Sequence, residues 1–330
     1  MAISRFSRST IVNGVPRPIS LNPIQATGGV IVISSKHIYH VFKSNGDFIP
    51  SNTITCEALL VGGGGAGGGY TAGSPGGGGG GAGGVLFISK SLFSPITYSA
   101  IVGAGGLGRN QNPQNGGNTT FYGKTAFGGG AGGDTQGAAG GCGGGGGRDA
   151  TTTGGASTQT EGFGNAGGNT TSNSYGGAAG GGGAGSPGQN GPANGPVGGD
   201  SGSGNPGDWY AGFGGSGINL WKSWLSDIVP AMTDVSGWVE ATSTGFIAGG
   251  GGGGGFQLPG NIVAPGGNGG GGNGGIASDG RGSWTFGTTN ATDGKTNKGS
   301  GGGGAYTGSS SGGCQAGNGG SGLIIVRYEY

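Results

Sequence analysis

Residues 58–69 have the sequence ALLVGGGGAGGG, and this stretch decides the fold. The first four residues are apolar and predict a buried β-strand. The tract from Gly62 to Gly69 follows without a turn, although glycine loses more backbone freedom on folding than any other residue and has no side chain to bury. The chain holds 99 glycines and 14 prolines in 330 residues, a composition typical of low complexity. The fold therefore depends on whether such tracts are linkers or packed elements.

Two features indicate packed elements. Only 8% of the chain is charged and 31% is hydrophobic, whereas disordered segments are usually rich in charge. The tracts at 62–69 and 76–84 are also bounded by strand-like segments, and alanine is the only residue that replaces glycine within them. Glycine chains can form the threefold polyproline-II helix, whose N–H and C=O groups must pair with neighbouring chains. Collagen is excluded, because the sequence lacks the strict G-X-Y period that a collagen triple helix requires. We therefore predict a bundle of polyglycine-II rods on a β-scaffold.

The scaffold is predicted from short apolar or alternating segments. An Asn45-Gly46 turn favours a hairpin, and the last strand, 322–328, is almost continuously apolar, as expected for a central strand buried on both faces. The pattern predicts an all-β fold with a jelly-roll-like β-sandwich at 28–127, completed by 320–330. The other predicted strands are 30–34, 38–42, 53–61, 85–93, 97–102, 119–122 and 125–127.

Residues 128–319 are expected to form the rest of the glycine bundle. Residues 205–247 interrupt it and hold four of the five tryptophans. Apolar residues at Ile218, Trp221, Trp224 and Ile228 recur at helical spacing before a proline, which predicts one short helix. The rod candidates in this region are 128–133, 140–147, 176–185, 249–255, 266–275 and 301–304.

The first 27 residues carry three prolines and no acidic residue. Proline removes ladder donors and favours extended backbone, so this segment is expected to be an arm rather than part of a sheet. It is either a docking segment that lies along a partner or a frayed terminus, and we favour docking. Its basic residues, Arg5, Arg8 and Arg17, are the candidate contacts.

The overall composition argues against several classes of partner. The formal net charge of +1 gives no field that would attract nucleic acid or an anionic membrane. No apolar run approaches the roughly 20 residues of a membrane span, and the N-terminus lacks the apolar core of a signal peptide. Three free thiols are favoured over a bridge between Cys142 and Cys314, because an odd and widely spaced set does not define a disulfide framework.

The motifs that usually carry catalysis or cofactors are weak or incomplete. Matches to G-x-G-x-x-G carry no weight in a chain so rich in glycine, and the two Gly-Lys-Thr triplets lack the first glycine of a P-loop. His37 and His40 are three apart on a predicted strand, so they point to opposite faces and cannot share a metal ion. The acidic residues are scattered singly, without the carboxylate pair of a glycosidase. We expect no enzyme activity, no metal and no cofactor.

Several junctions, taken in order, resemble the glycine-rich domain found in phage tail and virion proteins. They are residues 28–29, 39–42, 46–48, 59–62, 84–85, 101–106 and 319–328. A similar region occurs in receptors of the anaplastic-lymphoma-kinase type, and glycine-helix bundles form adhesins that cap some phage tail fibres. The resemblance implies a virion-surface or adhesive protein, either a tail fibre or fibre-tip adhesin or, alternatively, a structural capsid decoration or head-fibre protein. By analogy with viral fibres, it also implies a homotrimer whose N-terminal attachment arm, residues 1–27, contacts other virion proteins.

Two groups of aromatic residues are the candidate contact sites. Rings in polar loops at the ends of the bundle are expected to bind a host surface glycan or outer-membrane protein, because they stack at low entropic cost. Tryptophans of the 205–247 insertion are expected to form a partner or subunit interface or to fill a small core, and the alternative is that they contact the receptor. The candidate receptor residues are Tyr70, Tyr175, Trp284, Phe286 and Tyr306, and the candidate interface residues are Trp209, Trp221, Trp224 and Trp238.

Overall fold

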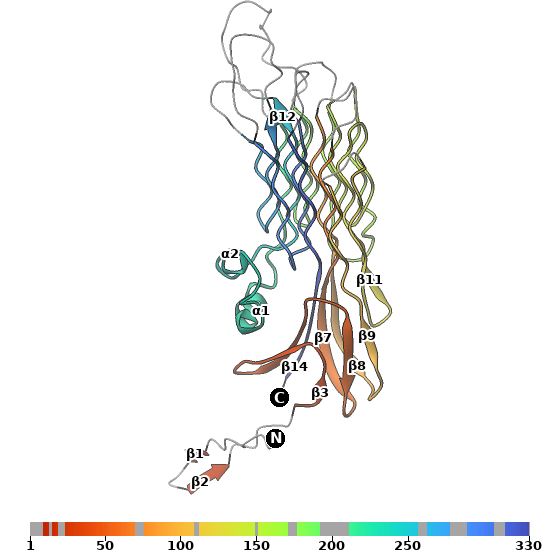
Figure 1. Ribbon diagram of the computed structural model, residues 1–330. Coiled ribbons are helices and arrows are strands. Elements are labelled where there is room, and N and C mark those ends of the chain that lie inside the picture. Colours follow the sequence, from red (N-terminus) through yellow and green to blue (C-terminus); the bar gives the residue numbers. More distant parts are fainter. Residues whose placement is uncertain are drawn as a thin grey trace, which may run out of the picture.

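The computed structural model places a β-sandwich at one end of the molecule and a bundle of extended glycine rods at the other (Figure 1). It describes residues 24–69, 76–108, 112–148, 151–170, 177–191, 211–256, 263–277, 289–306 and 314–329, together with the backbone at 9–12 and 15–18. Within these residues the fold is all-β apart from short helices in one insertion, as predicted.

The sandwich consists of two sheets. One has the order β4-β5-β14-β7-β8, and the other has the order β3-β6-β9 and is continued by the hairpin of β10 and β11 through a bridge from Ile101 to Thr120. The strands are β3 (Ala26–Thr27), β4 (Val30–Ile33), β5 (His37–Phe42), β6 (Gly46–Pro50), β7 (Ile54–Val61), β8 (Val85–Phe93), β9 (Tyr98–Ala100), β10 (Thr119–Phe121), β11 (Lys124–Ala126) and β14 (Leu323–Glu329).

Alternating apolar side chains hold the two sheets together. Phe48 from the smaller sheet meets Phe93 from the larger one edge-to-face at 5.9 Å, and Phe121 stacks on Phe93 at 5.8 Å. The C-terminal strand β14 lies between β5 and β7, with antiparallel pairing on both sides. Its predicted central position is confirmed, and its apolar run is buried on both faces because each face contacts a separate core cluster.

Three strands of the larger sheet continue directly into rods. β7 leads into 62–69, β8 is preceded by 76–84, and β14 is preceded by 314–322. The neighbours stay the same across the junction, because rod 62–69 donates hydrogen bonds to both of the other two rods. The sheet therefore sets the register of the first rods, and both predicted blocks, 28–127 and 128–319, contribute to the bundle.

Rod 76–84 shows the threefold symmetry expected of polyglycine II. Its N–H groups take three partners in rotation: residues 77, 80 and 83 donate to segment 299–305, residues 78, 81 and 84 to 127–133, and residues 79 and 82 to 179–182. Its carbonyl groups accept from three further segments, 62–68, 142–148 and 251–254. A period of three with neighbours on all sides matches three residues per turn, so each rod satisfies its backbone through other rods.

Glycine is required in these rods because the backbones approach one another closely. A Cβ atom added at Gly79 would lie 2.0 Å from the Gly251 carbonyl oxygen, far inside van der Waals contact. The alanines of the first two tracts, Ala66 and Ala82, occupy buried positions where a methyl group fits. Near the far end of the bundle, a parallel pair, β12 (Gly255–Phe256) and β13 (Ile276–Ala277), joins two rods.

The tryptophan-rich insertion forms two α-helices rather than the single one predicted. They are α1 (Lys222–Asp227) and α2 (Trp238–Thr244), with a 3₁₀ turn, η1 (Val229–Ala231), between them. Pro230 lies in the 3₁₀ turn, and Gly237 has a left-handed φ of 74° before α2 begins. These breakers end the first helix early and let the chain turn into a second one.

This insertion lies beside the sandwich and covers the outer face of the larger sheet (Figure 1). Its described tryptophans share one core cluster with Tyr39 and Leu59 of that sheet; they are Trp221, Trp224 and Trp238. The Tyr39 hydroxyl donates to Asp227 Oδ2 at 2.7 Å, and the buried Lys298 Nζ donates to the Gly237 carbonyl at 2.7 Å. The insertion is therefore fixed to both the sheet and the bundle.

The N-terminal segment contains a small hairpin of its own. β1 (Ser9–Val12) pairs antiparallel with β2 (Val15–Pro18). The prediction of an arm outside any sheet is therefore wrong for these residues: the two strands join neither sheet of the sandwich, but they form a two-stranded sheet with each other. Cys56, Cys142 and Cys314 are all buried free thiols, as predicted.

Candidate functional site at the two ends of the glycine bundle

The end of the bundle farthest from the sandwich is the first candidate site. There, the described rod ends lie side by side: Gly76 bridges to Tyr306, the Arg148 N–H donates to the Gly76 carbonyl at 2.9 Å, and the Gly254 N–H donates to the Gly77 carbonyl at 2.9 Å. These rod ends flank segments 70–75, 149–150, 171–176, 192–210, 257–262, 278–288 and 307–313. Rod ends that are far apart in the sequence therefore lie together at one end of the frame, which we name the distal end.

Polar side chains fix the rod ends at the distal end. Thr152 and Thr170 are buried, bridge to each other through their backbones, and both donate from their hydroxyl groups to the Gly147 carbonyl, at 2.6 and 2.9 Å. The Arg148 guanidinium donates to the Tyr306 hydroxyl and lies 5.2 Å from the centre of that ring. These contacts hold the exit points of several segments in one arrangement.

The predicted exposed position of Tyr306 is wrong. Its ring is only 2% exposed, and its backbone exchanges hydrogen bonds with the Cys314 thiol. The ring is buried because it packs between rods and under the Arg148 side chain. It therefore stabilises the packing of the rods and is not accessible to a partner. The other predicted receptor residues lie outside the described residues, but the distal end holds the flanks of the segments that contain them; they are Tyr70, Tyr175, Trp284 and Phe286.

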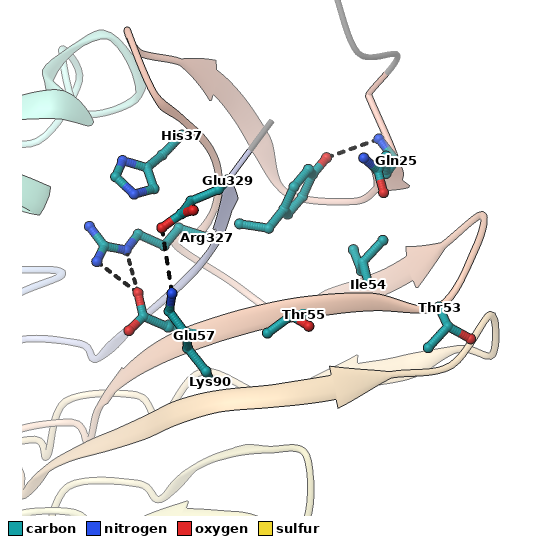
Figure 2. A pocket seen from close by; sticks show the side chains of 10 residues that line it. Gln25, His37, Thr53, Ile54, Thr55, Glu57, Lys90, Arg327 and Glu329 are labelled. Carbon is teal, nitrogen blue, oxygen red and sulfur yellow. Dashed lines mark hydrogen bonds and ion pairs between the residues drawn. The ribbon is translucent and has the colours of Figure 1, made fainter.

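The sandwich end carries the second candidate site, a pocket of about 270 Å³ (Figure 2). It lies where β14 ends, between β5 and the start of β7, with Gln25 of the incoming chain above it. The backbone N–H of Gln25 donates to the Tyr328 hydroxyl at 3.1 Å, so the pocket joins the two terminal parts of the chain. Its polar wall also includes the hydroxyl groups of Thr53 and Thr55.

Two ion pairs cross the pocket. Arg327 contacts Glu57 Oε2 through both Nε, at 2.8 Å, and Nη2, at 2.7 Å, and its guanidinium also stacks 4.0 Å from the Trp224 ring centre. Lys90 lies 3.6 Å from Glu329 at the exposed rim. Each charge therefore has an opposite charge close by, which suits a pocket that holds strands together or binds a neutral polar group. The sequence signal for this site is the few charged residues on otherwise apolar strands, namely Glu57, Lys90, Arg327 and Glu329.

The two histidines point to opposite faces of β5, as predicted. His37 lines the pocket, and burial together with the nearby Arg327 charge lowers its pKa. His40 lies in the sandwich core, where its Nδ1 donates to the Gly28 carbonyl at 2.7 Å and its ring stacks on Tyr328. Burial lowers the pKa of His40, although the bond to Gly28 partly opposes this shift.

The sequence also matches a family described as a glycine-rich domain, over residues 43–329. The chain belongs to this family. The match covers the bundle and the sandwich from β6 onward, whereas β3, β4 and β5 precede it. No protein in a comparison with curated sequences matches the chain.

The three tryptophans that the structure describes belong to the core. The predicted role of Trp221, Trp224 and Trp238 at a partner or subunit interface is wrong, because their side chains are 9%, 3% and 3% exposed and pack within the chain. The alternative, that they fill a small core, is confirmed for these three. Trp209, Arg5 and Arg8 lie outside the described residues, and Arg17 lies in β2, where only the backbone is described.

The described part of the glycine-rich domain holds no group of three or more His, Cys, Asp or Glu side chains that could bind a metal ion. None of the helices that it describes has the length and apolar character needed to cross a bilayer.

Proposed function

We propose that this glycine-rich domain is a phage virion-surface protein, a tail fibre or fibre-tip adhesin whose distal segments bind a host receptor. One observation carries the proposal: segments from the whole length of the chain leave the rigid frame at the distal end, opposite the end that holds the terminal parts of the chain. Binding residues commonly lie on loops that a rigid scaffold positions. The N-terminal arm, with its arginines, then attaches the protein to the virion.

The frame suits this role because its stability comes from contacts among the rods and does not depend on the sequence of the distal segments. Each rod is stabilised by backbone hydrogen bonds to other rods, and the described rod ends are fixed by local contacts such as those of Thr152 and Thr170. The distal segments can therefore differ in length and sequence while the exit points stay in place. Aromatic residues there, including Trp284 and Tyr175, are suited to stack on a host glycan or to contact an outer-membrane protein.

The proposal is tested by replacing residues 171–176 and 278–288 with Gly-Ser segments of equal length. We expect the variant to keep its melting temperature and to lose adsorption to host cells, measured by flow cytometry with fluorescently labelled protein. The matched control replaces the exposed turn 94–97 at the sandwich end and should keep adsorption. Unchanged adsorption by the first variant would favour the alternative, a structural capsid decoration or head-fibre protein in which the arm alone matters.

A further inference from the structure

β4 is an open edge of the larger sheet. On one side it pairs with β5 along its whole length, and no described strand pairs with its other side. Its four residues are all apolar, and Val30, Ile31 and Ile33 are 43%, 36% and 56% exposed. A free strand edge presents unpaired N–H and C=O groups, so an apolar edge of this kind is a template for another strand.

The opposite edge of the same sheet is protected. In β8, Val85 exchanges two backbone hydrogen bonds with Phe163, at 2.9 and 2.8 Å. The strand then carries Ser89, Lys90 and Ser91, and a charged residue at an edge opposes further pairing. β4 contains no charged residue and no proline. The difference between the two edges indicates that β4 is left open for a specific strand.

The N-terminal hairpin has a strand that can pair with such an edge. β1 and β2 pair only with each other among the described strands, and a two-stranded hairpin is marginally stable by itself in water. β2 contains Pro16 and Pro18, which lack N–H donors, so β1 is the strand of the hairpin that can pair further. β1 and β4 are both four residues long.

Charge also favours this pairing. The first 27 residues contain arginines at positions 5, 8 and 17 and no acidic residue. Next to β4, the turn η1 contacts the strand, and the acids Asp227 and Asp234 lie on either side of η1 in the sequence. Asp234 is well exposed even though it pairs with Lys43.

We propose that β1 of one copy adds to the free edge of β4 in a neighbouring copy, so that the arm links protomers through their sheets. The hairpin lies clear of its own sandwich in Figure 1, and among the described strands of its own chain only β2 pairs with β1. Strand addition supplies main-chain hydrogen bonds, and exchange of an arm is a low-cost route to an oligomer. Because the two surfaces differ, the contact runs from one copy to the next and can close into a ring.

The experiment uses co-expressed full-length copies that carry different tags. One copy has Thr10→Cys in β1, and the other has Ile33→Cys in β4. A short bismaleimide should join the two different copies into a covalent dimer. The three native thiols should not react with the maleimide, because all of them are buried. Burial raises the pKa to about 12 for Cys56 and Cys142 and to about 11 for Cys314, so little reactive thiolate is present.

The control replaces Ile33→Cys with Leu92→Cys, which lies on the protected edge strand and is 65% exposed. It should give no dimer. Equal crosslinking to both positions, or no crosslinking to Ile33→Cys, would overturn the proposal. So would a link found only within a single chain that carries both Thr10→Cys and Ile33→Cys, since the arm would then cover its own edge.

A second measurement needs no added thiol. Deleting residues 1–23 should reduce the mass measured by light scattering to that of one chain, and Ile33→Lys should do the same while the tryptophan fluorescence of the fold is unchanged. An oligomer that survives the deletion would refute the role of the arm. Because assembly is measured without host cells, this result is independent of receptor binding.

Discussion

The substitution Gly79→Ala tests the packing of the rods. Gly79 lies in the middle of rod 76–84, where an added Cβ would meet the Gly251 oxygen at 2.0 Å, the Gly251 carbon at 2.5 Å and the Gly181 nitrogen at 2.9 Å. All three are backbone atoms of other rods, so no side chain can rotate away. Normal contact begins near 3.4 Å, and at least one neighbouring rod must therefore move by more than about 1 Å.

The expected cost follows from that movement. Overpacking a well-packed interior costs about 1–3 kcal/mol, and each hydrogen bond lost adds about 0.5–1.5 kcal/mol. The bonds at risk are Gly79 N–H to the Ala179 carbonyl and Gly251 N–H to the Gly80 carbonyl. We expect the free energy of unfolding to fall by about 2–6 kcal/mol. For 330 residues the entropy of unfolding is about 0.7 kcal/mol/K, so the melting temperature should fall by about 3–9 °C.

Calorimetry on the full chain measures this effect, with Gly255→Ala as the matched control. At Gly255 the nearest atom to an added Cβ is the Ala211 side chain at 3.5 Å, and the backbone φ is not left-handed. Such a Gly→Ala change should stabilise by about 0.4–1 kcal/mol, because it restricts the unfolded chain. If Gly79→Ala matches or exceeds the wild type in stability, the rods are not close-packed and the polyglycine-II description is wrong.

Two further predictions concern the sandwich and its cover. Trp224→Ala should lower the free energy of unfolding by about 3–5 kcal/mol in urea titrations, because it removes a buried ring that packs on Tyr39 and Arg327, whereas Leu220→Ala at a 64% exposed site should cost less than about 0.5 kcal/mol. The free energy of unfolding should also fall as pH drops below about 6.5, the usual pKa of histidine. The pKa of His40 is lowered in the folded state, so below this pH the unfolded chain binds more protons than the folded one. Thermal melts of His40→Gln should therefore show a weaker pH dependence.

The strands of the sandwich could be predicted because their apolar patterns are local. β5, β7, β8 and β14 lie within one or two residues of their predicted limits, and the central position of β14 follows from its continuous apolar run. The tryptophan-rich insertion was predicted less well. Its apolar spacing indicated one helix, but Gly237 in a left-handed conformation starts a second one, and that choice depends on tertiary contacts such as the bond from Lys298.

The candidate sites could be predicted only in part. The sequence placed loops between rods, but it could not show which rods are neighbours, because glycine tracts carry no side-chain pattern that distinguishes one partner from another. Tyr306 was expected in a loop for this reason, whereas the bridge to Gly76 draws it into the frame. The pocket at Arg327 and Glu57 depends on pairing between strands that are separated by most of the chain.

The threefold pattern also determines how the bundle fails. Rod 76–84 bonds to six segments, so removing it would leave unpaired groups in every one of them. An unpaired buried backbone group costs about 1–3 kcal/mol, and several such costs exceed what a small sandwich can supply. The rods must therefore form or separate together rather than fray one by one. All rod ends then unfold in the same cooperative transition. The positions at which the distal segments join the rods therefore stay fixed until the whole frame unfolds.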